Sequence, residues 1–93
     1  MTIRITAFEW DELNSRHIEF HSEHPVSRDI IEEMFAFGEF RVRKTKSDRY
    51  MALGHHPDGY YLAVVFANKG GGTVRPISAR GMAPWEKKLY RRK

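Results

Sequence analysis

Apolar and polar positions along the first half of the chain predict one strand followed by two helices. Ile3 and Ile5 flank a polar residue, as in a strand with one buried face, and we expect this strand to continue through Phe8 and Trp10. Apolar residues then recur at helical spacing over residues 12–21, which predicts a short amphipathic helix.

A second helix is predicted after Pro25, which breaks the first one. Ser27 is a good N-cap, because its hydroxyl can accept a hydrogen bond from the first helical turn. The apolar positions that follow have helical spacing: Ile30, Ile31, Met34, Phe35 and Phe37. Gly38 is expected to end this helix.

The second half of the chain predicts an antiparallel sheet. Its four strands are expected at residues 39–44, 49–55, 60–66 and 73–79. The third of these is apolar on both faces, so we place it centrally. Pro57-Asp58-Gly59 and Gly70-Gly71-Gly72 are typical of hairpin turns. Pro76 predicts that the last strand lies at an edge or carries a bulge.

Together these elements predict an α+β fold in one domain, residues 1–93. The expected order is an N-terminal strand, two helices, a four-stranded antiparallel sheet and a C-terminal helix beginning near Pro84. The sequence contains no internal repeat and no shift in composition that would mark a second domain.

The composition excludes several kinds of site. The chain has no cysteine, which rules out a disulfide framework and a thiolate metal site. No segment approaches the roughly 20 apolar residues of a membrane helix, and the N-terminus lacks the apolar run of a signal peptide. No glycine-rich phosphate loop precedes a Lys-Ser/Thr pair and a helix. We therefore expect a cytoplasmic protein that makes no contact with a membrane.

Charge is divided unevenly along the chain. Residues 1–40 hold nine acidic and three basic residues, whereas residues 41–93 hold three acidic and thirteen basic ones. This asymmetry predicts a face for a polyanion, either RNA or the acidic surface of a protein. The alternative is that edge strands and the last helix carry basic residues for solubility. The candidate RNA contacts in this half are Arg41, Arg43, Lys44, Lys46, Arg75 and Lys87.

Candidate catalytic groups lie near strand ends and on the last helix. Arg49 begins a predicted strand and Arg80 ends one, so the sheet could aim either guanidinium at a phosphate. Glu86 and Tyr90 are four residues apart, hence on one helix face, and could assist proton transfer. Alternatively, Arg80 pairs with Glu86 to anchor the helix, and Arg49 pairs with Asp48.

His17 and His21 are neighbours on one face of the first helix. Because imidazole titrates near neutrality, either could act as general base for attack of a ribose 2′-hydroxyl on phosphate. A metal site would need a third ligand, for which His24, Glu12 and the His55-His56 pair are alternatives that no sequence feature separates. We therefore expect no metal and no other cofactor. The alternative use of His17 is packing at a half-buried position.

Three groups of residues resemble the BrnT-type toxins of bacterial toxin–antitoxin pairs. They are Phe8-Glu9-Trp10-Asp11-Glu12, then Arg49-Tyr50 with Gly54 and Asp58-Gly59, and finally Ile77-Ser78-Ala79-Arg80 with Glu86 and Tyr90. The resemblance covers nearly the whole chain. The sequence departs from these toxins at Asn14 and Ile18, where they usually carry lysine and asparagine.

The resemblance implies a RelE-like fold and metal-independent cleavage of RNA. It also implies a small cognate antitoxin, resembling ribbon-helix-helix proteins and encoded beside the toxin, through which toxin copies would join into any oligomer. Asn14 occupies the position of the toxins' lysine and is therefore a further candidate RNA contact.

Two functions are consistent with these residues. The first is a toxin-like endoribonuclease in which Arg49 and Arg80 hold the scissile phosphate, His17 or His21 accepts a proton, and Glu86 or Tyr90 assists. The second is a non-catalytic module of the same fold that keeps the basic face for a nucleic acid or an acidic partner. RNA cleavage by the purified protein would separate the two.

Overall fold

The computed structural model describes residues 5–21, 27–46 and 48–91, and its elements follow the predicted order. They are β1 (Ala7–Phe8), α1 (Glu12–His21), α2 (Arg28–Phe37), β2 (Glu39–Lys44), β3 (Arg49–His55), β4 (Tyr61–Gly70), β5 (Thr73–Gly81) and α3 (Pro84–Arg91). The predicted α+β fold is confirmed. The N-terminal strand is shorter than predicted, and its expected start at Ile3 lies outside the described residues.

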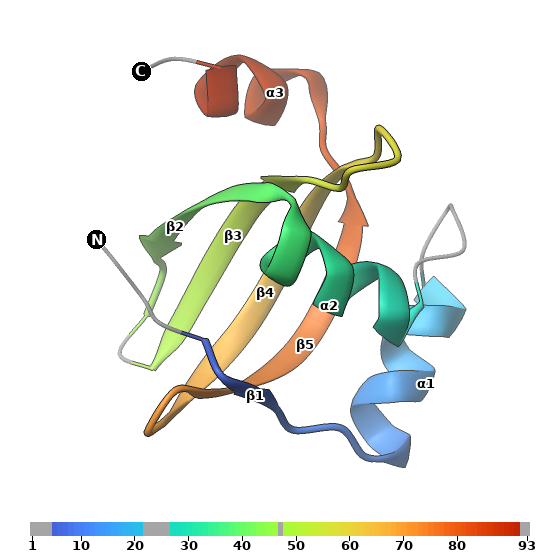
Figure 1. Cartoon of the computed structure of the whole chain (residues 1–93), viewed down its shortest axis with the longest axis vertical. Coiled ribbons are helices and arrows are strands. Elements are labelled where there is room, and N and C mark those ends of the chain that lie inside the picture. Colours follow the sequence, from blue (N-terminus) through green and yellow to red (C-terminus); the bar gives the residue numbers. More distant parts are fainter. Residues whose placement is uncertain (1–4, 22–26, 47, 92–93) are drawn as a thin grey trace.

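All five strands form one sheet in the order β1-β5-β4-β3-β2, which curves across the molecule in Figure 1. Strands β2 to β5 pair antiparallel, and β1 joins β5 in parallel. The predicted central position belongs to β4, which pairs with β3 on one side and β5 on the other. Strand β2 lies at the end of the sheet.

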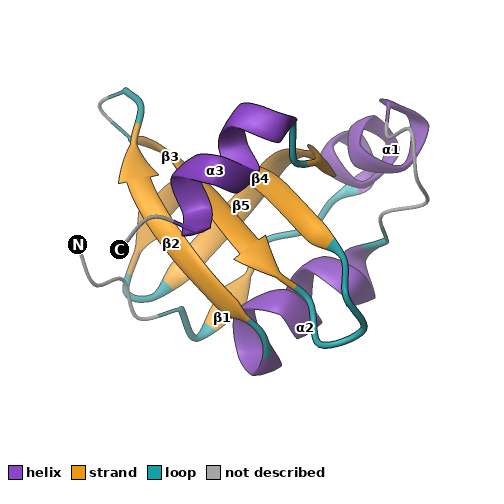
Figure 2. Ribbon diagram, turned by 90° about the horizontal axis from the view of Figure 1, so that it is seen from above, coloured by secondary structure: helices purple, strands orange, loops and turns teal. Residues whose placement is uncertain are grey.

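Helices cover both faces of the sheet. Figure 2 shows α2 on one face and α3 on the other. The main core lies on the α2 side, where Ile18 of α1 and Ile31 and Met34 of α2 pack against Val64 and Phe66 of β4. A smaller cluster lies under α3, around the buried residues Leu53, Ala63 and Met82. The two faces therefore differ: one is filled by the core, and the other is only partly covered.

Two local features fix how these layers meet. A Cβ atom on Gly54 would collide with the sulfur of Met34, so glycine lets α2 approach β3 closely. Of the two alternatives predicted from Pro76, the bulge is present, since the register of β4 and β5 shifts between Val65 and Phe66 beside this proline; the edge position is wrong, because β5 lies between β1 and β4. The predicted N-cap is also present, since the Ser27 hydroxyl accepts a hydrogen bond from the Ile30 N–H. None of the described helices is long and apolar enough to cross a membrane.

Candidate nucleic-acid interface

Five arginines project from the sheet face that turns toward α3, and we call this surface the arginine face. They are Arg41, Arg43, Arg49, Arg75 and Arg80. Direct cross-strand partners share a face of a sheet. One row of partners runs Arg41, Leu53, Ala63 and Arg80; the next runs Arg43, Met51, Val65 and Ser78; a third runs Arg49, Ala67 and Arg75. Leu53 and Ala63 pack under α3, which identifies the face.

The centre of the arginine face is an uncharged floor. It consists of Met51, Val65, Ala67 and Ser78. Val65 is half-buried and borders a hollow of about 510 Å³, whose other walls are Thr45, Lys46, Asp48 and Arg49. A groove of about 290 Å³ opens between β2 and α3, lined by Arg41, Val42, Arg43, Leu53, Leu89 and Tyr90. The face therefore offers a basic rim around a floor without charge.

Arg80 is held in a two-pronged ion pair with Glu86. Its Nη1 and Nη2 atoms donate to the two carboxylate oxygens at 2.5 and 2.8 Å. The Ala83 N–H donates to the same carboxylate at 2.8 Å, so Glu86 also caps the first turn of α3. The Glu86 side chain is fully buried, whereas 52% of the Arg80 side chain is exposed. The anchoring bridge considered from the sequence is present, and it leaves one side of the guanidinium facing solvent.

The pKa of Glu86 reflects two opposed effects. Burial raises the pKa of this carboxyl. The hydrogen bonds from Arg80 and from the Ala83 N–H together lower it by more than burial raises it, so the pKa of Glu86 lies below the ordinary value of 4.5. The same ion pair raises the pKa of Arg80. Glu86 is therefore a carboxylate at neutral pH, which suits it to orienting Arg80 rather than to donating a proton.

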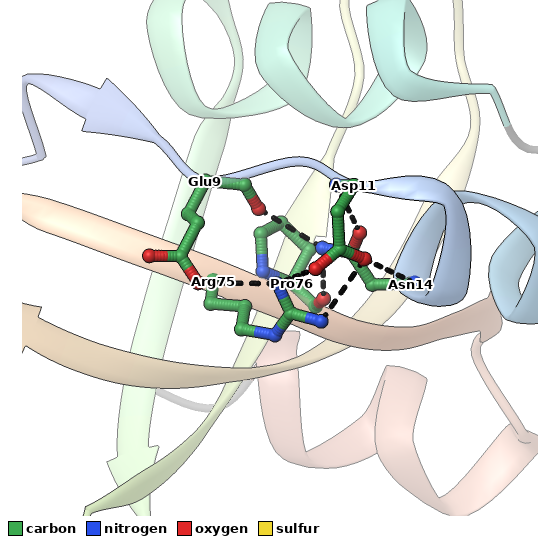
Figure 3. A network of polar contacts seen from close by, with 5 residues as sticks. All are labelled: Glu9, Asp11, Asn14, Arg75 and Pro76. Atoms are coloured by element: carbon green, nitrogen blue, oxygen red, sulfur yellow. Dashed lines mark hydrogen bonds and ion pairs between the residues drawn. The ribbon is translucent and has the colours of Figure 1, made fainter.

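Arg75 lies at the other end of the face, and its side chain points toward the segment that follows β1 (Figure 3). It donates twice to the Asp11 carboxylate, at 2.8 and 3.1 Å, and once to Glu9 at 3.1 Å. The hydrogen bond from Arg75 is the largest cause of the lowered pKa of Asp11. Arg75, which the sequence suggested as an RNA contact, thus uses some of its N–H donors to hold the N-terminal segment against β5.

Asn14 has a structural use that the sequence did not reveal. Its side chain, in a residue only 5% exposed, donates to the carbonyl oxygens of Glu9 and Pro76, both at 2.9 Å, as Figure 3 shows. Its Oδ1 atom accepts from the Asp11 N–H, and the Asn14 N–H donates to Asp11 in return. This reciprocal pair caps the start of α1. The Asn14 amide is therefore hydrogen-bonded within the protein and has little exposed surface with which to contact RNA.

The other predicted basic contacts are distributed over several elements. Arg41 and Arg43 are exposed on the arginine face, and Lys46 lines the hollow beside Arg49. The Arg49 Nε atom lies 3.5 Å from the Asp48 Oδ1 atom in an ion pair, and 43% of the Arg49 side chain remains exposed. Lys87 of α3 stands over the Tyr61 ring, 5.6 Å from its centre.

Lys44 is separated from this group. It pairs with Tyr50, whose ring stacks on Phe66 in the main core, so the register turns Lys44 toward the α2 side. Tyr90 does border the arginine face, but its hydroxyl donates to the carbonyl oxygen of Glu39 at 3.2 Å. Burial, followed by the nearby carboxylate of Glu39, raises the pKa of Tyr90, so the phenol is neutral near pH 7.

Only one of the two histidines chosen from the sequence has a described side chain. His17 is exposed on α1, whose neighbouring Ile18 packs into the core with α2. The side chain of His21 lies outside the described residues. The sequence suggested His55 only as a metal ligand. In the structure it is the cross-strand partner of Tyr61 on the arginine face, and the two rings stack with their centres 4.6 Å apart. Where the structure describes the chain, no three His, Asp or Glu side chains are grouped to hold a metal.

Comparison with known proteins identifies the family. The family model described as the ribonuclease toxin BrnT of type II toxin–antitoxin systems matches residues 10–86. The chain belongs to the BrnT family. The crystal structure of the Brucella abortus ribonuclease toxin BrnT superposes with a TM-score of 0.61 at 25% sequence identity, covering 88% of this chain and 99% of that one. A comparison with curated proteins found no match.

BrnT membership confirms the resemblance that the sequence suggested and gives the N-terminal motif a physical meaning. Phe8 packs its ring against Phe35, Glu9 and Asp11 bind Arg75, and the Trp10 indole N–H donates to Glu32 at 2.6 Å. These residues join the segment before α1 to both β5 and α2. The family also implies an RNA substrate and an antitoxin partner.

Proposed function

We propose that this BrnT-family toxin cleaves RNA on the arginine face without a metal ion, by attack of a ribose 2′-hydroxyl on the adjacent phosphate. The bond from the 2′ oxygen to phosphorus forms as the bond to the 5′ oxygen breaks. The 2′-hydroxyl proton passes to a base, and the leaving 5′ oxygen takes up a proton. The products are a 2′,3′-cyclic phosphate and a 5′-hydroxyl.

The observation that carries this proposal is the arrangement of five arginines around an uncharged floor on one sheet face. Guanidinium groups remain charged and bind phosphate through two parallel donors, so they can stabilise the charge that develops on phosphorus oxygens. Arg49 and Arg80 face β4 residues Ala67 and Ala63, four positions apart. That separation is roughly 13 Å along the strand. We therefore propose that the two arginines bind neighbouring phosphates of one bound RNA.

Arg80 is the arginine best suited to the reacting phosphate. Its two bonds to Glu86 fix the orientation of the guanidinium before RNA binds, so little reorganisation is needed in the transition state. Arg41, Arg43 and Arg49 lie on accessible parts of the same face and are suited to the flanking phosphates. We assign the proton acceptor to a histidine, and His55 is the candidate that shares the arginine face.

The partner is proposed to be an antitoxin with a ribbon-helix-helix-like domain, which would join toxin copies through its own dimer. The excess of basic over acidic residues in residues 41–93 supports an acidic contact surface on this partner. Size measurement of the co-purified pair tests the assignment. A one-to-one complex with no dimer of the antitoxin would contradict it.

We expect purified toxin to cleave RNA at an undiminished rate in excess chelator, with cleavage increasing across the pH range in which imidazole loses its proton. The measurement is cleavage of a labelled RNA with and without chelator, together with elemental analysis of the protein and the same assay on His55→Gln. Stoichiometric zinc, with activity lost on chelation and restored by metal, would contradict metal independence. An unchanged pH profile in His55→Gln would contradict only the histidine assignment.

A further inference from the structure

Strand β2 offers an edge to which another strand can pair. It ends the sheet, and among the described residues its strand partner is β3 alone. Along β2, Glu39–Lys44, alternate residues therefore present backbone N–H and C=O groups on the outer side of the sheet, and the Glu39 carbonyl oxygen already accepts a hydrogen bond from the Tyr90 hydroxyl. Such an edge is a template for strand addition by a partner.

The two faces of β2 differ in chemistry. Arg41 and Arg43 project toward α3 and are exposed. Phe40 and Val42 project the other way, where they are half-buried against the main core. An added strand would place its own side chains alternately beside these two pairs, because cross-strand neighbours share a face. Acidic residues would then meet the arginines, and apolar residues would extend the core.

Space for such side chains runs along β2. A second groove, of about 300 Å³, lies beside the groove of about 290 Å³ and is lined by Glu39, Phe40, Arg41, Tyr90 and Arg91. The two share Arg41 and Tyr90, and between them they touch every residue of β2 from Glu39 to Arg43. Because side chains of consecutive strand residues alternate between faces, contact with all five means that these grooves follow the strand.

We propose that an extended segment of the antitoxin adds a strand to β2, with acidic side chains toward Arg41 and Arg43 and apolar side chains toward Phe40 and Val42. The inference rests on the proposed toxin–antitoxin function and names how the partner reaches the site. Since Arg41 and Arg43 belong to the arginine face, the added strand would neutralise one side of that face. It would thereby compete with RNA.

Two other occupants fit the edge less well. A second copy of this chain, pairing through the same strand, would bring Arg41, Arg43 and Lys44 close to their own copies, and like charges opposite one another destabilise a sheet. RNA has no peptide groups to complete the backbone ladder and no alternation of acidic and apolar groups to match the two faces. The charge and apolar pattern of β2 therefore favour an acidic–apolar peptide.

The test uses an octapeptide of alternating Glu and Val as probe, with the full-length toxin. Three comparison peptides have the same composition: one with the four Glu before the four Val, and two N-methylated on alternate residues in either phase. Binding is measured by fluorescence anisotropy to wild type and to Arg41→Glu/Arg43→Glu. The matched control is Arg16→Glu/Arg28→Glu, which makes the same charge change on the helices α1 and α2.

We expect the alternating peptide to bind wild type and to compete with RNA. Affinity should fall by about tenfold or more in the segregated peptide and in Arg41→Glu/Arg43→Glu, but not in the control variant, because the ladder and the charge-assisted pairs both depend on this strand. N-methylation should weaken binding in one phase only, since alternate N–H groups of an edge strand face its partner.

Equal binding of the alternating and segregated peptides, or equal effects of both N-methylated phases, would overturn the inference. A toxin dimer that dissociates in Arg41→Glu/Arg43→Glu would assign the edge to a second copy instead. RNA cleavage is measured on the same preparations. Loss of the expected peptide pattern with cleavage intact rejects the inference alone, whereas the expected pattern in a protein that never cleaves RNA rejects only the proposed function.

Discussion

Replacing Arg80 by alanine is expected to lower the free energy of unfolding by about 3–5 kcal/mol, because it leaves a buried carboxylate without its charged partner. Glu86 is fully buried, and Arg80 supplies two of the three hydrogen bonds that its carboxylate accepts from the described residues. For a domain of this size, the melting temperature should fall by roughly 15 °C or more. Denaturant and thermal unfolding at pH 7 measure the effect.

The pH dependence of this loss provides a control. In wild type the pKa of Glu86 lies below 4.5, so its contribution to stability is present above that pH and is lost as the pH falls through the lowered pKa. Without Arg80, burial would raise the same pKa, and protonation at low pH would relieve the unpaired charge. The difference between the two proteins should therefore shrink as the pH falls from the raised pKa of the variant, above 4.5, to the lowered pKa of wild type, below 4.5. The double variant Arg80→Ala/Glu86→Leu should recover much of the stability; no recovery, and a pH-independent difference, would show that the pair is not the cause.

Reversing two solvent-accessible arginines, as Arg43→Glu/Arg49→Glu, is expected to reduce RNA cleavage by about a hundredfold or more, since each guanidinium–phosphate pair contributes roughly 1.5–3 kcal/mol. The dependence of RNA affinity on salt should also weaken, by about 0.7 in the log–log slope for each phosphate that is no longer neutralised. The measurements are cleavage rate and RNA affinity over a range of salt concentrations. Neither residue contributes to the core clusters, so the fold should survive.

The matched control for this prediction is again Arg16→Glu/Arg28→Glu. It changes the net charge equally but alters helices that pack on the other side of the sheet or beside it. A general effect of charge would reduce activity and salt dependence equally in both variants. That outcome would show that RNA does not bind preferentially to the arginine face.

Most of the fold could be predicted because its signals are local. Ser27 and Gly38 bound α2, and glycine-rich turns separate strands whose apolar patterns are evident. Pro76 indicated an irregular strand, either at an edge or with a bulge, since proline cannot donate a hydrogen bond within a regular ladder, and the structure has the bulge. The exact length of β1 did not follow, because its two residues are held by pairing with β5 rather than by a pattern of their own.

The candidate site depended on long-range contacts that spacing does not reveal. Arg75 binds Glu9 and Asp11, which precede it by more than sixty residues, and only the parallel pairing of β1 with β5 brings them together. The ion pair of Arg80 with Glu86 was foreseeable as an alternative, since the two are six residues apart across one turn. The shared row of Arg41 and Arg80 required the register of four strands.

The central claim is that the RNA supplies its own nucleophile and that the arginine face supplies the charge. The most direct measurement is cleavage, in excess chelator, of an RNA carrying a single 2′-deoxy nucleotide on the 5′ side of a bond that is normally cut. We predict that this bond alone resists cleavage, while neighbouring bonds are cut at the usual rate and yield 2′,3′-cyclic phosphate ends. Cleavage of the deoxy-substituted bond at an undiminished rate would show that the nucleophile is water, and would contradict the account.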